Sequence, residues 1–194
     1  MYFEQRTGSG AGPDTWCLWA RCELEGGFLD HVLPIMKKAL DKWPDHVGLI
    51  LVAGDAAEAL MDQKGVVDQL TMGYFEKSAD ILSDRSDTRL RYAVGLFQAG
   101  KYPESEREFC KALRLLPDYL SPTYFCHYWV DETGTRKQFS GKVVRQEDKW
   151  TVRSGNLLPI HISKGQIERG QISQGQMINF YIAFNYYGPA ALIV

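Results

Sequence analysis

The sequence of 194 residues lacks several patterns that would assign it to a common class of protein. No apolar run approaches the roughly eighteen residues of a membrane-spanning helix. The opening MYFEQRTGSGAGPD has no apolar core of the kind that a signal peptide requires. We therefore expect residues 1–13 to be a flexible lead-in and the protein to be cytoplasmic. The 4 cysteines show no CxxC spacing, which argues against zinc and disulfides and predicts reduced core thiols.

Signatures of enzymes are absent as well. Gly26-Gly27 is not followed by a lysine at the offset of a phosphate-binding loop. Cys126 and His127 are adjacent, so their side chains would face opposite sides of a strand and could not act together as nucleophile and base. The histidines are scattered without metal-binding spacing at His31, His46, His127 and His161. We expect a non-catalytic protein without cofactor or metal.

Charge is divided unevenly along the chain, although the overall net charge is only −2. Residues 1–120 contain 14 Lys and Arg against 19 Asp and Glu, whereas residues 121–194 contain 8 against 5. The first part is therefore acidic and the second part basic, which indicates two halves of different kinds.

Residues 87–117, DTRLRYAVGLFQAGKYPESEREFCKALRLLP, carry two apolar stripes at helical spacing. The first stripe ends before Gly100, where glycine permits a tight reversal, and Pro117 ends the second. This pattern predicts a helix hairpin. The positions that define it are Ala93, Gly100, Tyr102, Phe109, Ala112 and Pro117.

In order and spacing, these six residues resemble the signature of a tetratricopeptide repeat. The segment 14–44 fits the same signature, and Val47–Leu82 fits it with a first helix about one turn longer. The resemblance implies an all-α array of three helix hairpins over residues 14–120. An irregular helical bundle is the alternative. The matching positions of the first segment are Trp16, Trp19, Ala20, Gly27, Ala39 and Pro44.

At Leu120-Ser121-Pro122 the pattern changes from helical to alternating, and the composition shifts toward strand-forming residues. Five or six short strands within residues 121–194 predict a small all-β barrel, with a sandwich as the alternative. The expected strands are Thr123–Val130, Gln138–Gln146, Trp150–Ser154, Leu157–Ile162, Gln176–Phe184 and Ala190–Val194. The fold class is thus α+β with segregated domains.

The ending GQMINFYIAFNYYGPAALIV resembles the last two strands of the cold-shock family of OB-fold barrels. Gly141-Lys142-Val143 resembles that family's opening strand, and residues 159–163 resemble its central strand. Such barrels bind single-stranded RNA or DNA by stacking bases on aromatic side chains beside Lys and Arg. Carried over by position, the resemblance implies stacking on Trp150 and His161 with Lys149 as a basic neighbour. Together with the nearby Lys142, Arg145 and Arg153, these residues form the expected nucleic-acid site.

This stacking platform is incomplete. Val152 and Ile160 stand where the family has aromatic residues, and Arg145 replaces a tryptophan. The alternative is that Trp150 belongs to the core, that His161 is an ordinary strand histidine, and that the positive charge is a solvated surface.

The inner groove of the helical array offers a second candidate surface. Arg21 of the first repeat and the apolar Leu90, Val94 and Phe97 of the third are expected to contact a partner helix or an extended peptide. An element of the same chain could cover this patch instead. Because no polar capping helix follows the third repeat, we expect the next domain to pack over Leu113, Leu115 and Leu116.

Together these features predict an adaptor that holds a protein partner in the repeats and single-stranded RNA or DNA on the barrel. The alternative is a purely protein-interacting or assembly module, with the barrel as a cap or dimer interface. Such a module could be the C-terminal sensor part of a longer protein.

Overall fold

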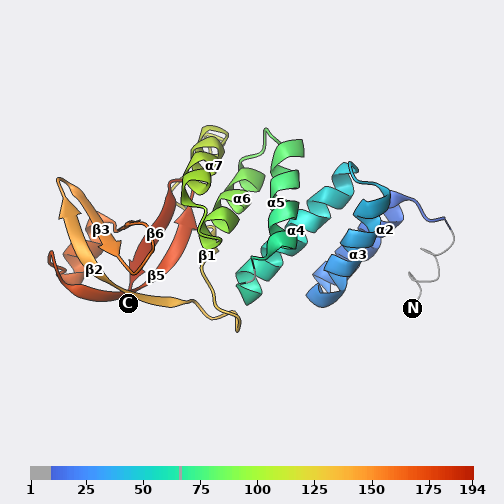
Figure 1. Cartoon of the computed structure of the whole chain (residues 1–194). Coiled ribbons are helices and arrows are strands. Elements are labelled where there is room, and N and C mark those ends of the chain that lie inside the picture. Colours follow the sequence, from blue (N-terminus) through green and yellow to red (C-terminus); the bar gives the residue numbers. More distant parts are fainter. Residues whose placement is uncertain (1–9, 66) are drawn as a thin grey trace.

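The chain folds as a row of helix hairpins followed by a β-barrel, and the computed structural model describes residues 10–65 and 67–194 (Figure 1). This arrangement confirms the predicted fold class of segregated helical repeats and strands. The hairpins are α2 (Pro13–Glu25) with α3 (Leu29–Lys42), α4 (Val47–Lys64) with α5 (Gln69–Ile81), and α6 (Ser86–Gln98) with α7 (Tyr102–Arg114). Of the predicted lead-in, residues 1–9 lie outside the described residues, and α2 already begins at Pro13.

Glycines form the reversals of the first and third hairpins. Gly27 and Gly100 both have a φ of 77°, in the left-handed region that glycine adopts without a steric penalty. The second hairpin differs because α4 has 18 residues, whereas α2, α5, α6 and α7 have 13 each. The longer first helix of the middle repeat was therefore predicted correctly. None of the helices in the described ranges combines the length and apolarity that a membrane crossing requires.

Small residues lie where the two helices of each hairpin cross. Ala20, Ala93 and Ala112 are fully buried. In the second hairpin Gly54 takes the corresponding place, and an added Cβ there would lie 3.3 Å from the hydroxyl oxygen of Ser78 in α5. This close approach explains why the repeat signature demands a small side chain at these positions.

The second half of the chain is a closed five-stranded barrel. Its strands follow one another in the order β2 (Gln138–Gln146), β3 (Lys149–Arg153), β4 (Ile160–His161), β6 (Gly188–Ile193) and β5 (Met177–Asn185), and β5 pairs again with β2. Only the pairing of β4 with β6 is parallel among these strands. The short β1 (His127–Tyr128) pairs with β5 beyond the end of β2.

Some strands are shorter than the sequence predicted, and one helix was not expected. The segments Thr123–Val130 and Leu157–Ile162 narrow to the two-residue strands β1 and β4. Helix α8 (Lys164–Gly170) lies between β4 and β5, and it buries only Ile167. A helix with a single buried side chain leaves no apolar periodicity in the sequence, so pattern analysis could not find it.

The barrel interior is formed by side chains that alternate along the strands. Val143, Val152 and Ile160 are fully buried and lie opposite one another across β2, β3 and β4. Phe180 and Ile182 of β5 complete this core. Since side chains alternate with a period of two, the register also fixes which polar residues face outward.

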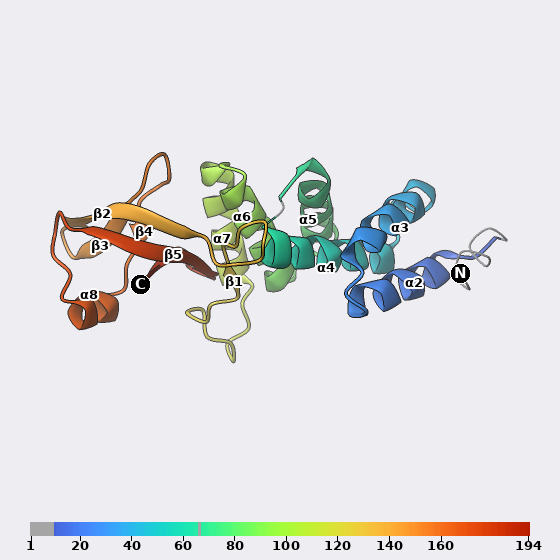
Figure 2. The ribbon, with the colours of Figure 1, turned by 90° about the horizontal axis from the view of Figure 1, so that it is seen from below.

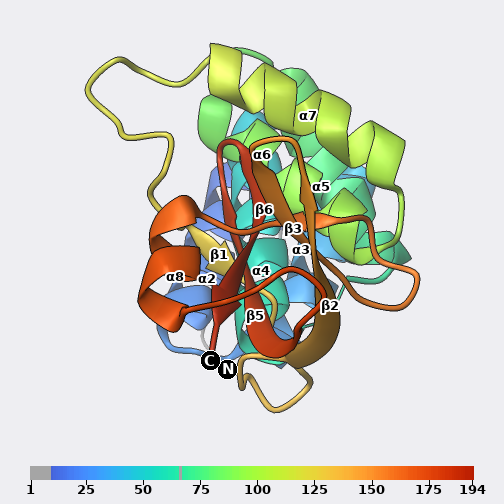
Figure 3. The same ribbon diagram turned by 90° about the vertical axis from the view of Figure 1, so that its left-hand side faces the viewer.

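The barrel docks against the third hairpin; it lies beside α6 and α7 in Figure 1 and in front of the helical array in Figure 3. Phe184 of β5 lies against Phe97 of α6, with ring centroids 5.5 Å apart, and against Phe109 of α7, at 6.5 Å. Leu113 and Leu116 are partly buried, as expected for a helix that the next domain covers, whereas Tyr119 is 84% exposed. The main contact on α7 is therefore Phe109, which lies earlier in the helix than the leucines.

All four cysteines are free within the described chain. Cys22 and Cys110 are exposed, and Cys17 and Cys126 are half-buried. The prediction of core positions was wrong for Cys22 and Cys110, whereas Cys17 and Cys126 pack against the core as partly buried residues.

Candidate functional site

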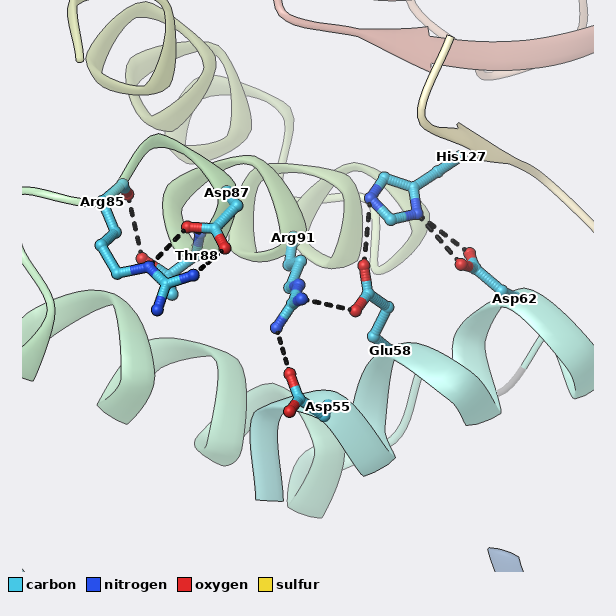
Figure 4. A network of polar contacts seen from close by, with 8 residues as sticks. All are labelled: Asp55, Glu58, Asp62, Arg85, Asp87, Thr88, Arg91 and His127. Carbon is cyan, nitrogen blue, oxygen red and sulfur yellow. Dashed lines mark hydrogen bonds and ion pairs between the residues drawn. The ribbon is translucent and has the colours of Figure 1, made fainter. Parts of the chain in front are cut away.

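A row of acidic side chains on α4 marks the junction between the repeats and the barrel (Figure 4). Asp55, Glu58 and Asp62 recur at helical spacing and share one side of α4. Arg91 of α6 bonds two of them, because its Nη1 donates to Asp55 Oδ1 at 2.7 Å and its Nη2 lies 2.8 Å from Glu58 Oε2. The side chain of Arg91 is only 17% exposed, so these ion pairs are poorly screened by water.

His127 of β1 joins this row from the barrel side. Its Nδ1 lies 3.1 Å from both carboxylate oxygens of Asp62, and its Nε2 lies 3.6 Å from Glu58 Oε1. The side chain is 5% exposed. The loop after β1 reaches the end of the same helix, where the backbone of Val130 lies against Gly65 (Figure 2). His127 therefore connects the barrel to the second repeat, in addition to the aromatic contacts with the third.

The cluster perturbs nearby ionisable groups. Burial raises the pKa of the Glu58 carboxyl, and the positive charge of Arg91 and of His127 partly opposes this effect. Burial also raises the pKa of the Cys126 thiol, and the carboxylates of Glu58 and Asp62 raise it further. A thiol with a raised pKa stays protonated at neutral pH and is a poor nucleophile.

Glu58, Asp62 and His127 also form a group whose potential metal-ligand atoms lie within 4.8 Å of one another, among the residues described. Their geometry fits an ion-paired imidazole better than a metal centre. The two ring nitrogens of His127 face different carboxylates, whereas a single ion would bind only one of them. Glu58 is in addition bonded to Arg91. Each carboxylate of the row therefore has a partner within the cluster, which forms a structural contact between the two halves.

Three of the four residues predicted to bind a partner are not accessible. Leu90, Val94 and Phe97 are buried in α6. The barrel covers this part of the inner groove, since Phe97 contacts Trp129 at a centroid distance of 6.0 Å in addition to Phe184. This corrects the expectation of an open apolar patch. Arg21 on α2 is exposed and lies at the far end of the array from the barrel (Figure 1).

The residues predicted to bind nucleic acid divide between the two faces of the barrel wall. Arg145 lies opposite Trp150 on the face that carries Val143 and Val152, and its guanidinium lies 5.3 Å from the Trp150 ring centre. Trp150 is half-buried against the core. The resemblance placed Trp150 and His161 on one stacking surface, whereas the register places them on opposite faces.

The remaining four predicted residues lie on the outer face. Lys142 lies opposite Arg153, and His161 of β4 lies opposite Thr151 of β3. Lys149 shares this face by its spacing from Thr151 and Arg153. All four predicted residues are exposed. The outer face of β2, β3 and β4 is therefore basic but does not carry Trp150, the tryptophan that was expected to stack a base.

Sequence reasoning missed the role of His127. The signals present in the sequence were the acidic spacing on the first helix of the middle repeat and a lone histidine early in the β half. They could not be combined without the structure, because His127 and Asp62 are 65 residues apart in the sequence.

No family model matches the sequence, and no curated protein matches it. Among solved structures, the chain is similar to MamA of AMB-1, with 21% identity, a TM-score of 0.48, and coverage of 55% of this chain and 56% of MamA. YrrB, described as a TPR protein with an unusual peptide-binding site, gives 14% identity, a TM-score of 0.49, and coverage of 60% and 58%. TTC0263, a thermophilic TPR protein of Thermus thermophilus, gives 18% identity, a TM-score of 0.42, and coverage of 58% and 62%. The chain thus spans less than two thirds of the length of each of these structures.

Proposed function

We propose that the chain is a non-catalytic adaptor that holds a protein partner on the inner face of the first repeat. This proposal rests on the observation that the inner face of the array is buried at the third repeat and exposed at the first. The barrel packs on the third repeat at Phe97, where Leu90 and Val94 are also buried, whereas Arg21 of the first repeat is exposed. Repeat arrays expose continuous concave surfaces that suit protein partners.

Arg21 is the residue through which this surface would recognise a partner. A guanidinium offers bidentate hydrogen bonds to a carboxylate, so an acidic peptide fits best. Cys17 and Leu24 lie one helical turn on either side of Arg21 and are half-buried, which leaves room for apolar contacts.

The test is selection of binding peptides from a displayed library on the immobilised full chain. Selected peptides should be enriched in Asp and Glu, and Arg21→Glu should weaken their binding about tenfold or more, as loss of a charged hydrogen bond does. Arg107→Glu on the exposed side of α7 is the matched control and should change little. Peptides that bind both variants equally would contradict a site at Arg21.

A second function is favoured by the basic outer face of the barrel. We infer that it binds single-stranded RNA or DNA as an OB-fold of the cold-shock kind, an interpretation supported by its closed five-stranded order. Lys142, Lys149 and Arg153 would contact phosphates, and His161 would contact a base. Arg145 and Trp150 would support this binding indirectly, by fixing the turn between β2 and β3. In that turn Arg145 Nε donates to the carbonyl oxygen of Glu147 at 3.0 Å.

Binding of a labelled single-stranded oligonucleotide, measured by fluorescence anisotropy across a salt titration, tests this function. Each phosphate contact contributes about −0.7 to the slope of log K against log salt, so Lys142→Ala with Arg153→Ala should reduce the slope by about 1.4. The double variant Lys37→Ala with Lys38→Ala, at exposed positions of α3, should leave the slope unchanged. Absence of binding at low salt would leave the chain a purely protein-binding module, with the barrel as a cap.

A further inference from the structure

A trough lies on the outer surface of the barrel where β4 and β6 run parallel. Its volume is about 640 Å³. The floor carries His161 opposite Ala190, and Gly188 and Leu192 continue the same outward row along β6. Because Gly188 and Ala190 project almost no side chain, the floor is flat and low.

Side chains of different chemistry flank this floor. Gln166 and Arg169 of α8 form a polar and basic wall. The aromatic part of the lining consists of Phe125, from the segment before β1, and Tyr187, from the turn between β5 and β6. Tyr187 is 64% exposed and Phe125 half-buried, so both rings are within reach of a ligand.

The position of Arg169 is set by its own helix. Its Nε donates to the carbonyl oxygen of Gly165 at 3.0 Å, which holds the guanidinium along α8 beside the trough. A cationic group and aromatic rings thereby line the same trough. A ligand that satisfies both needs a flat ring system and a negative charge.

We propose that this trough receives one nucleotide unit, with its base against Tyr187 and Phe125 and its phosphate toward Arg169 and His161. The volume lies within the range of about 300–1,000 Å³ typical of small-molecule sites. Gln166 and Ser163 line the trough as well and can bond the edge of a base. This proposal rests on the second function above and names the place where a base would be held.

The trough also continues the basic face in space. Lys142 lies opposite Arg153 in one outward row. The neighbouring outward row on the same face runs from Val144 through Thr151 and His161 to Ala190, and so crosses from β2 to β6. A single strand whose phosphates follow Lys142 and Arg153 would reach the trough at His161. A free nucleotide would present the same base and phosphate as one unit of a single strand. The experiment below distinguishes the free nucleotide from the single strand by using one probe of each kind.

The test measures binding of adenosine monophosphate and of a hexa-uridylate to the full chain by NMR and anisotropy. Stacking on an aromatic ring contributes a factor of about ten per base, so Tyr187→Ala should weaken binding about tenfold without changing the salt slope. Arg169→Gln should reduce the slope by about 0.7. Tyr119→Ala is the control, since Tyr119 is also exposed but lies outside the trough.

The possible outcomes distinguish this proposal from the single-strand binding on which it rests. Equal oligonucleotide binding by the wild type, Tyr187→Ala and Tyr119→Ala would overturn the trough while leaving a nucleic-acid surface elsewhere on the barrel. Binding of the monophosphate alone, lost in Tyr187→Ala, would support the trough and contradict the single-strand function. Failure of both probes to bind the wild type would overturn both.

Discussion

Glu58 couples the stability of the fold to pH through the burial of its carboxyl. Burial raises the pKa of its carboxyl above the ordinary value of 4.5. The charges of Arg91 and His127 oppose this rise, and the charges of Asp62 and Asp55 add to it. The folded protein therefore retains a proton that the unfolded chain has already released. By linkage, this contribution to stability is complete below the unfolded pKa and is lost as pH rises through the folded pKa.

We predict that Glu58→Gln abolishes this loss, because glutamine does not titrate. Urea unfolding measured between about pH 4 and pH 7 should show that the free energy of unfolding of the wild type falls relative to that of the variant as pH rises. Glu106→Gln, at an exposed position on α7, is the control and should keep the pH dependence of the wild type. Parallel curves for all three proteins would show that Glu58 titrates normally.

Residue types were more predictable than the faces on which they lie. Composition and resemblance identified Lys142, Arg153 and His161, and all three are exposed on one face. Trp150 was assigned to the same surface, but it pairs with Arg145 on the opposite face. A shift of one residue in register exchanges the faces of a strand, and the two-residue β4 leaves no periodic pattern from which to read the register.

At the scale of elements, the close packing of neighbouring helices depends on whether a glycine at their contact has room for a side chain. In α6, a Cβ added to Gly95 would lie 3.0 Å from Met72 Sδ and 3.0 Å from a ring carbon of Phe75, both in α5. In α5, a Cβ added to Gly73 would have no neighbour within 4 Å. Both glycines are interior to helices, so they form a matched pair.

We predict opposite effects for the two alanine substitutions. Gly95→Ala should destabilise the protein by about 1–3 kcal/mol, because it forces the packed second and third hairpins apart. Gly73→Ala should stabilise it by about 0.5–1 kcal/mol, because alanine restricts the unfolded chain without a new contact. Chemical denaturation of both variants measures this difference. Stabilisation by Gly95→Ala would show that the packing between hairpins is looser than the structure indicates.

Elements with a strong local pattern were the ones that sequence predicted. The helix hairpins follow from apolar stripes of 3.6-residue period and from glycines at the reversals, so their number and order were predictable. Helix α8 was missed because the segment around it contains few apolar residues, and only Ile167 of the helix is buried. The long strands β2 and β5 were found, whereas β1 and β4 are too short to alternate.

At the scale of the whole molecule, the barrel acts as the cap that the array lacks in its own sequence. It places Phe184 against Phe97 and Phe109, and it turns the inner apolar face of the third repeat into core. The sequence indicated that the next domain must pack on the last repeat, but not that it would contact the inner groove at Phe97. That depends on contacts between residues far apart in the chain, which no local pattern encodes.

The ionic cluster should add a measurable coupling to this aromatic interface. His127 and Asp62 belong to different halves of the molecule and lie 3.1 Å apart, with His127 almost fully buried. Removal of Asp62 leaves the buried His127 with only the longer contact to Glu58, and removal of His127 leaves Asp62 beside another carboxylate. A double-mutant cycle of His127→Ala and Asp62→Ala should therefore give an interaction energy of about 1–3 kcal/mol in urea unfolding.

The control pair is Lys64 and Asp30, which lie 2.8 Å apart but are 42% and 84% exposed. Exposed pairs contribute about 0–1 kcal/mol, so their cycle should give a smaller coupling, further reduced by salt. If the His127–Asp62 coupling is no larger than that of the control, the barrel is fixed by its aromatic contacts alone. A larger coupling would mean that the orientation of the barrel on the repeats, and with it the direction in which the basic face points, depends on one buried histidine.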